Sequence, residues 1–288
     1  MPSKFSDWEL WENAPAFTEA SLKETLLGGQ AFRWVQKEDF FEGRWATQVV
    51  RLRLVEEALY LASCESDARA ALDQYFARAT DFAGMTDALP WRSDPIMKTA
   101  VEAFNGLRIL RQPLGETLFC FLCSSTKQIP QIKAICEAVA SDMGPKLSDG
   151  SHALPDWLTI ADAGEARLRT AKLGYRARYI HATACFLAEH PEWLMQIESA
   201  PTEQARERLL ELPGVGRKIA DCVLLFGAGR MDAFPIDTWV EKILTRAYGL
   251  EGWNLPQLQT FARAHFGPSA GYAQQYLFAA ARAGYIPA

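Results

Sequence analysis

The sequence has no long hydrophobic run and no leader-like beginning. No segment of its 288 residues approaches the roughly 20 consecutive apolar residues that a membrane-spanning helix needs. Residues 1–8 lack the basic start and apolar stretch of a secretory signal. We therefore expect a cytoplasmic protein with no membrane partner, in a compartment that includes the chromosome in bacteria.

Positive charge is scarce as well. Lys and Arg together number 30 against 35 for Asp and Glu, so the formal net charge is −5. This balance counts against a nucleic-acid partner held by a generally basic surface. It does not exclude a local basic face, so a partner of this class must be inferred from motifs.

Cysteine occurs six times, and only Cys120 and Cys123 form a C-x-x-C pair. They lie in the apolar segment 118–123, with no second pair or nearby His to complete a metal site. We expect both to be buried as small apolar side chains. No cysteine follows Cys222, which argues against an iron–sulfur cluster with four C-terminal cysteines, and no motif requires another cofactor.

Hydrophobic residues make up 49% of the chain, enough for a large core. Residues 1 to about 63 show strand patterns, with a glycine turn at 28–29 before the aromatic segment 30–34 and two strand-like runs within 40–63. From about residue 67 the pattern becomes helical, and Asp94-Pro95 is typical of a helix start. Helices are predicted over 116–143, 157–171, 176–189, 202–212, 217–227, 238–248, 255–265 and 270–283.

The predicted fold class is therefore α+β. A small antiparallel β-sheet domain with a flanking helix, residues 1–95, packs on a larger all-helical domain, residues 96–288. The boundary is expected near residues 90–98.

The most informative segment is a helix pair joined by glycines. The helix that begins at Thr202 is stopped by Pro213, and Gly214-Val215-Gly216 leads directly into a second helix. In such a helix–hairpin–helix the free N–H groups of the second helix point outward and can bind a DNA phosphate, whatever the net charge. The alternative is a plain helical hairpin whose glycines serve only the tight turn.

Two ionisable residues follow this hairpin. Lys218 lies in the first turn of the second helix, where the helix dipole disfavours the ammonium form and so favours the neutral amine of a nucleophile. Asp237 reads as a helix N-cap, although Thr238 with Glu241 forms a capping box that would free its carboxylate to face a positive charge on a sugar. Taken singly, Lys218 also fits a phosphate contact and Asp237 a purely structural cap.

The hairpin, a lysine two residues after it and an aspartate nineteen residues further on resemble the helix–hairpin–helix DNA glycosylase superfamily. Within it the chain is similar to the 8-oxoguanine DNA glycosylase family. The supporting segments are GQAFRW at 29–34, LFCFLCSS at 118–125, LGYRARY at 173–179 and AGYAQQYLF at 270–278.

The resemblance implies a bifunctional base-excision repair enzyme, a glycosylase and AP lyase, with a TBP-like N-terminal β domain. Its partner would be double-stranded DNA that contains an oxidised purine. It would flip 8-oxoguanine out of the duplex, excise it, and nick the strand by β-elimination through a lysine Schiff base. We expect a monomer, associated with the nucleoid in a bacterium or nuclear in a eukaryote.

The resemblance also implies roles for individual residues. Lys218 would attack C1′ and Asp237 would stabilise the oxocarbenium-like charge. The base would be held by the Gly29 carbonyl, Cys222, Gln274 and Phe278. Contacts with the DNA would come from Tyr175 as a wedge, Arg176 beside the orphaned base, and the hairpin glycines Gly214 and Gly216. Backbone carbonyls of Leu210, Leu212 and Val215 would hold a monovalent cation that bridges to phosphate.

The chain departs from the family pattern around the orphaned base. Thr126 stands in place of the first asparagine and Gln131 in place of an arginine, both of which contact the estranged cytosine. Trp239 stands where a phosphate-contacting histidine is common. These departures predict a weaker preference for cytosine opposite the lesion.

Two other functions remain open from the sequence. One is a glycosylase for another damaged base such as an alkylated purine. The presence of Gly29 and Gln274 in their motifs argues against it. The other is a non-catalytic DNA-binding module that uses the hairpin only as a clamp, which would need neither Lys218 nor Asp237.

Overall fold

The computed structural model describes residues 5–288 and contains one five-stranded antiparallel sheet. The spatial order is β1-β5-β4-β3-β2. The strands are β1 (Glu9–Leu10), β2 (Trp34–Gln36), β3 (Phe41–Trp45), β4 (Gln48–Val55) and β5 (Ala58–Ser63). In β4 the inward Val50 and Leu52 are buried and the intervening Arg51 is half-buried, as the alternating sequence predicts.

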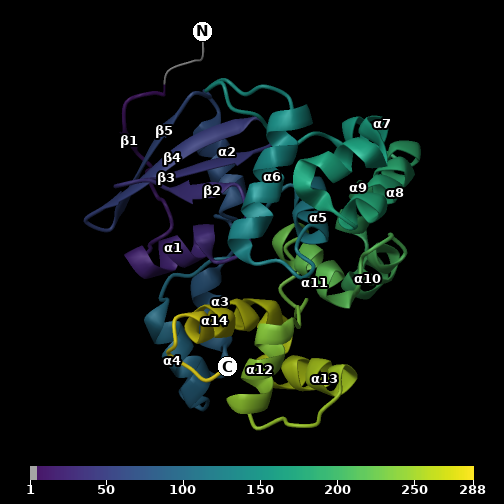
Figure 1. Cartoon of the computed structure of the whole chain (residues 1–288). Coiled ribbons are helices and arrows are strands. Elements are labelled where there is room, and N and C mark those ends of the chain that lie inside the picture. Colours follow the sequence, from purple (N-terminus) through teal and green to yellow (C-terminus); the bar gives the residue numbers. More distant parts are fainter. Residues whose placement is uncertain (1–4) are drawn as a thin grey trace.

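Helices form the rest of the chain, and Figure 1 shows them beside and below the sheet. They are α1 (Glu19–Leu27), α2 (Ala68–Tyr75), α3 (Phe82–Ala88), α4 (Pro95–Ala103), α5 (Leu114–Leu122), α6 (Ile129–Met143), α7 (Trp157–Leu168), α8 (Arg176–Glu189), α9 (Trp193–Ser199), α10 (Thr202–Leu210), α11 (Arg217–Phe226), α12 (Thr238–Arg246), α13 (Leu255–Phe266) and α14 (Ala270–Arg282). No helix within residues 5–288 is long and apolar enough to cross a membrane. The predicted α+β class is confirmed.

The predicted single helix over 116–143 is wrong, because the structure divides it into α5 and α6. The break contains Thr126, whose φ of 55° lies in the left-handed region. Gln128 then starts α6 as its N-cap, with a proline in the first turn. This break matters for function because it creates a loop at residues 123–128 that faces the site described below.

Smaller differences also have local causes. Within residues 1–63 the sequence pattern predicted no helix, yet α1 lies there; only Leu22 and Leu26 are buried apolar residues in it, so its helical signal is weak. The helix predicted over 157–171 is α-helical only as far as Leu168, and a short π-helix, Arg169–Leu173, follows it directly and contains Lys172 with a φ of 68°. Helix α9 was not predicted either.

The buried side chains form two main clusters. One surrounds the sheet and includes Trp34, Phe76 and Leu110, and the other runs through the helices. Helix α4 packs against α14 near the C-terminus of the chain, as seen at the base of Figure 1. We retain a division after residue 95 as a proposal, since α4 belongs by its packing to the helical part.

Cys120 and Cys123 are buried, as predicted.

The α10–α11 pair is locked by a buried ion pair. Arg206 Nε lies 2.6 Å from Asp221 Oδ1, and the two side chains are 5% and 0% exposed. Glu203 supplies a second, more exposed carboxylate 2.6 Å from Arg206 Nη1. This contact fixes the two helices that present the hairpin.

Asp221→Ala is expected to lower the free energy of unfolding by about 3 kcal/mol, since it leaves a buried arginine without its main partner. The double variant Arg206→Met/Asp221→Leu removes both charges and is expected to stay within about 1 kcal/mol of wild type. Urea unfolding of both variants measures these values. A single variant as stable as the double variant would contradict the prediction.

Candidate active site

Five segments of the chain meet in one small cavity of about 50 Å³. Helix α11 contributes its Lys218, Cys222 and Phe226 face, and Asp237 enters from the start of α12. The lining residues are Gly29, Phe121, Lys218, Cys222, Phe226, Pro235, Asp237, Gln274, Gln275 and Phe278. All six residues predicted for catalysis and base binding are therefore in one place. Phe121, Phe226, Pro235 and Gln275 were not singled out by sequence.

Lys218 is half-buried and enters the cavity from the first turn of α11. Its Nζ donates a hydrogen bond of 3.3 Å to Ser124 Oγ and lies 5.1 Å from the centre of the Phe121 ring. Ser124 Oγ in turn donates to the Phe121 carbonyl at 2.7 Å. The loop between α5 and α6 thus orients the amine. Ser124 was not assigned to the site from the sequence, although Ser124 belongs to the 118–125 motif.

Cys222 lies one turn after Lys218 on the same face of α11. Burial raises the pKa of its thiol to about 12, with the nearby Lys218 charge acting in the opposite direction. Cys222 is therefore a neutral, apolar wall near neutral pH. This suits contact with the face of a base rather than nucleophilic attack.

Asp237 is the N-cap of α12, and this corrects one expectation. Its Oδ1 accepts hydrogen bonds from the N–H groups of Trp239 and Val240, at 3.0 and 2.9 Å. The predicted displacement by a Thr238–Glu241 capping box is wrong, because the extended backbone of Asp237 already aims its own carboxylate at these N–H groups. Within residues 5–288 Oδ2 has no hydrogen-bond partner, so one oxygen caps the helix and the other is unpaired in a side chain that lines the cavity.

Two glutamines on α14 bring unpaired amide groups to the cavity. Gln274 is 5% exposed and its buried Oε1 has no partner within the described chain; the same holds for Nε2 of Gln275. Buried polar atoms in folded proteins are almost always hydrogen-bonded. The unpaired atoms of Gln274 and Gln275 are therefore available to hydrogen-bond with a molecule bound in the cavity.

Gly29 forms the opposite wall. Its φ is +102°, and a Cβ atom there would lie 2.8 Å from Ile129 Cδ1 and 3.9 Å from the Phe278 ring. Both the backbone conformation and the close approach require glycine. Ile129 and Phe278 therefore pack close to Gly29, and Phe278 also lines the cavity.

The hairpin between α10 and α11 has the predicted glycine geometry. Gly214 has a φ of +81°, and a Cβ atom there would lie 2.9 Å from Tyr179 Cβ. Gly216 is the extended N-cap of α11, with open space around it. Tyr175 stands beside this hairpin with 52% of its surface exposed, packed edge-to-face on Tyr179 at 6.4 Å. An aromatic side chain thus projects next to a set of free N–H groups.

The remaining residues predicted to contact DNA differ in exposure and in their hydrogen bonds. Arg176 is only 4% exposed; it donates to the Ser125 carbonyl and, at 2.9 Å, to Thr126 Oγ1, so it holds the loop that precedes α6. Gln131 Oε1 accepts from the Gln128 N–H at 3.0 Å and completes the capping box of α6. Trp239 is 44% exposed beside Asp237. Their contacts with DNA stay predictions.

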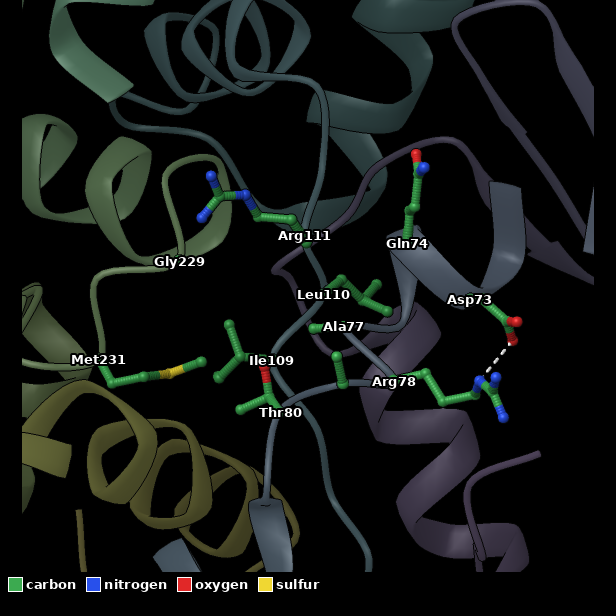
Figure 2. A pocket seen from close by; sticks show the side chains of 11 residues that line it. Asp73, Gln74, Ala77, Arg78, Thr80, Ile109, Leu110, Arg111, Gly229 and Met231 are labelled. Atoms are coloured by element: carbon green, nitrogen blue, oxygen red, sulfur yellow. Dashed lines mark ion pairs between the residues drawn. The ribbon is translucent and has the colours of Figure 1, made fainter. Parts of the chain in front are cut away.

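A larger cavity of about 660 Å³ lies elsewhere and shares no lining residue with the first. Figure 2 shows the Arg78–Asp73 ion pair on one side of it and Arg111, Gly229 and Met231 on the other. Its floor includes Ile109 and Leu110. None of the predicted catalytic or base-binding residues reaches it, so size alone does not identify the site.

Comparison with known proteins agrees with this arrangement. Residues 15–118 match the model of the 8-oxoguanine DNA glycosylase N-terminal domain, and residues 120–264 match that of the HhH-GPD superfamily of base excision DNA repair proteins. The N-glycosylase/DNA lyase OGG1 of Arabidopsis thaliana is 31% identical over 286 residues, which cover 91% of this chain and 78% of that protein. The N-glycosylase/DNA lyase of Saccharomyces cerevisiae is 32% identical over 263 residues, 80% of this chain and 69% of that one.

Among solved structures, the 8-oxoguanine glycosylase/lyase of Clostridium acetobutylicum has a similar fold along nearly the whole chain. The complex of that enzyme with double-stranded DNA containing cytosine opposite 8-oxoguanine superposes with a TM-score of 0.87 at 29% identity, over 98% of this chain and 99% of that one. With Lys218 and Asp237 of its motif in one cavity, this chain belongs to the 8-oxoguanine DNA glycosylase family of N-glycosylase/DNA lyases.

Proposed function

We propose that the protein excises 8-oxoguanine from duplex DNA and then nicks the strand at the resulting abasic site. The observation that carries this proposal is the joint placement of Lys218, Asp237 and an unpaired buried amide in one cavity beside the hairpin. A pure DNA-binding module has no use for this combination. All the groups involved come from a single chain, so the proposed active form is a monomer.

Lys218 is the nucleophile of this mechanism. Its neutral amine attacks C1′ of the flipped nucleotide, the N–C1′ bond forms and the bond to the base breaks with its electron pair. The base leaves with a proton that the attacking amine has released. Opening of the sugar ring then gives an imine, and loss of a C2′ proton expels the 3′ phosphate and nicks the strand.

Asp237 acts beside this amine through the carboxylate oxygen that the helix cap does not use. A negative oxygen fixed in the cavity stabilises the positive charge that develops on the sugar as the base departs. It can also pass protons between the amine, the leaving base and C2′. The cap bonds hold the carboxylate in place, so little reorganisation is needed during the reaction.

Base recognition is proposed to use the cavity walls. The Gly29 carbonyl accepts the N7–H that 8-oxoguanine has and guanine lacks, while Cys222 and Phe278 stack on the two faces of the ring. Gln274 reads the Watson–Crick edge with its unpaired amide. Because 50 Å³ is far below the roughly 300 Å³ of typical ligand pockets, side chains of the lining, such as Phe278, must move to admit the base.

DNA binding is proposed to centre on the hairpin and Tyr175. The N–H groups of Gly214 and Gly216 bind a phosphate, and the exposed Tyr175 ring enters the space that the flipped base leaves. Carbonyl oxygens of Leu210, Leu212 and Val215 are hard donors that suit a monovalent cation. The Leu212 carbonyl accepts the Val215 N–H at 3.1 Å and keeps a second lone pair for an ion.

The base opposite the lesion is expected to matter less than in relatives with the full asparagine and arginine set. Thr126 has a short side chain already engaged by Arg176, and Gln131 caps α6, so neither offers a cytosine the donors of arginine. Single-turnover excision from duplexes with each of the four opposite bases measures this. A collapse of activity on every pairing except cytosine would contradict it.

Borohydride trapping tests the proposed function. Duplexes that carry 8-oxoguanine, guanine or an alkylated purine at one position are incubated with the protein and sodium borohydride. We expect a covalent protein–DNA adduct and a nicked strand with 8-oxoguanine alone. Excision of the alkylated purine without an adduct would replace the proposal with a monofunctional alkyl-base glycosylase, and binding with no excision would reduce it to a DNA clamp.

A further inference from the structure

One face of α14 extends from the base cavity to the end of α1. Gln274, Phe278 and Arg282 are spaced four residues apart, so their side chains lie in one row along the helix. The first two line the cavity. Arg282 is in the last turn, and the proposed mechanism gives it no role.

Arg282 contacts both walls of the cavity at once. Its Nη1 donates to the Gly28 carbonyl at 3.0 Å and to Glu24 Oε1 at 3.1 Å. The carbon of its guanidinium lies 5.5 Å from the centre of the Phe278 ring. A single cation therefore connects the loop before Gly29 with the aromatic wall, and it also sits favourably at the negative end of α1.

Glu24 completes the arrangement from the last turn of α1. Its side chain is 14% exposed, and burial raises the pKa of the carboxyl while the Arg282 charge counteracts this. The carboxylate lies against Gly28, where a Cβ atom would be 2.1 Å from Glu24 Oε1. Gly28 is thus enclosed by one carboxylate and one guanidinium.

Another cation faces this pair from α6. Lys133 Nζ donates to the Trp34 carbonyl at 2.8 Å, and burial together with the Arg282 charge lowers the pKa of its amine to about 8. Within residues 5–288 its amine has no hydrogen bond to Gly28 and no cation–π contact with Phe278, so Arg282 is the group that joins the two walls.

The orientation of the Gly28 carbonyl matters because that carbonyl and the Gly29 N–H belong to the same peptide plane. Gly29 has no side chain that would restrict its backbone angles, and its φ is +102°. The direction of the Gly29 carbonyl must therefore be fixed by its surroundings. Discrimination between 8-oxoguanine and guanine depends on the Gly29 carbonyl oxygen, which attracts N7–H but repels the lone pair of an unprotonated N7. Site geometry of this kind must be held within about 0.5 Å.

We propose that Arg282 is a positioning residue which aligns the Gly29 carbonyl with the Phe278 ring and thereby sets the preference for 8-oxoguanine over guanine. Glu24 holds the guanidinium in this position. The inference rests on the proposed function and adds a specificity residue outside the cavity lining.

Equilibrium binding in a Lys218→Gln background tests this without turnover of the lesion. Three duplexes are compared, which carry 8-oxoguanine, guanine or a tetrahydrofuran abasic analogue. Arg282→Gln is expected to lower the ratio of affinities for 8-oxoguanine and guanine about tenfold. Affinity for the abasic duplex, which offers no base to read, is expected to change less than about twofold.

Two variants serve as controls. Arg282→Lys keeps the charge and one donor and is expected to restore part of the ratio. Arg263→Gln changes an exposed arginine on α13 and is expected to leave all three affinities unchanged. Melting temperatures are recorded for each protein.

Equal loss of affinity on all three duplexes, or a lower melting temperature with an unchanged ratio, would overturn the proposal and leave Arg282 a structural residue. Should Arg282→Gln fail to fold, Glu24→Gln is the second test, with a severalfold lower ratio expected and an unchanged ratio overturning the proposal. If the parent Lys218→Gln protein itself shows no preference for 8-oxoguanine, the proposed function fails first and takes this inference with it.

Discussion

Replacement of Lys218 by glutamine is expected to abolish the borohydride-trapped adduct and to lower excision of 8-oxoguanine by at least about 10³-fold. Removal of a nucleophile lowers turnover by up to about 10⁶-fold in other enzymes. Glutamine retains a polar end group that can still bond with Ser124 Oγ and pack on Phe121, so the loss is assigned to the missing amine. Single-turnover excision and trapping on an 8-oxoguanine duplex measure it.

Lys98→Gln is the matched control for this experiment, since Lys98 is an exposed lysine on α4 paired only with Glu102 at 3.8 Å. Its adduct yield and excision rate are expected to equal those of wild type. DNA binding by Lys218→Gln is measured alongside. An adduct of undiminished yield in Lys218→Gln would show that another amine attacks the sugar.

Asp237→Asn separates the two functions of the α12 cap. Asparagine accepts N-cap hydrogen bonds about as well as aspartate, so the free energy of unfolding is expected to change by less than about 0.5 kcal/mol. The negative charge that faces the sugar is lost, and excision is expected to fall about 10²- to 10³-fold. Chemical unfolding and single-turnover kinetics on the same preparation provide the comparison.

Asp156→Asn gives a matched cap substitution away from the cavity. Asp156 caps α7 in the same manner, with Oδ1 accepting from the Thr159 N–H at 2.8 Å. This variant is expected to keep both stability and activity. If Asp237→Asn is as active as Asp156→Asn, Asp237 is a structural cap and not a catalytic group.

The pair of Lys218 and Asp237 also shows how much can be predicted from local sequence patterns. The glycine hairpin fixes Lys218 in the first turn of its helix. Asp237 directly follows Pro235-Ile236 and stands at the start of the next helix. The local sequence did not predict correctly which side chain caps α12, Asp237 or Thr238. Two capping arrangements were compatible with the residues, and the extended backbone at Asp237 decided between them.

The loop between α5 and α6 illustrates the opposite case. The sequence over 116–143 is compatible with one long helix, since Pro130 is the only strong interruption. The left-handed turn at Thr126 is stabilised from outside, by Arg176 of α8. Because that contact spans 50 residues of sequence, no local pattern predicts it, yet it sets the position of Ser124 against the catalytic amine.

The sequence by itself determined the α+β class, the helix–hairpin–helix and six of the residues that line the cavity, because period, turn chemistry and the spacing of the family motifs can be read along the chain. Only the tertiary structure decided that the cavity is as small as about 50 Å³, that Gln274 Oε1 lacks a partner within residues 5–288, and that Arg282 joins α14 to the end of α1. These features depend on distances between side chains far apart in sequence. Packing of the two clusters against each other sets those distances, and a single sequence does not encode them in any local pattern.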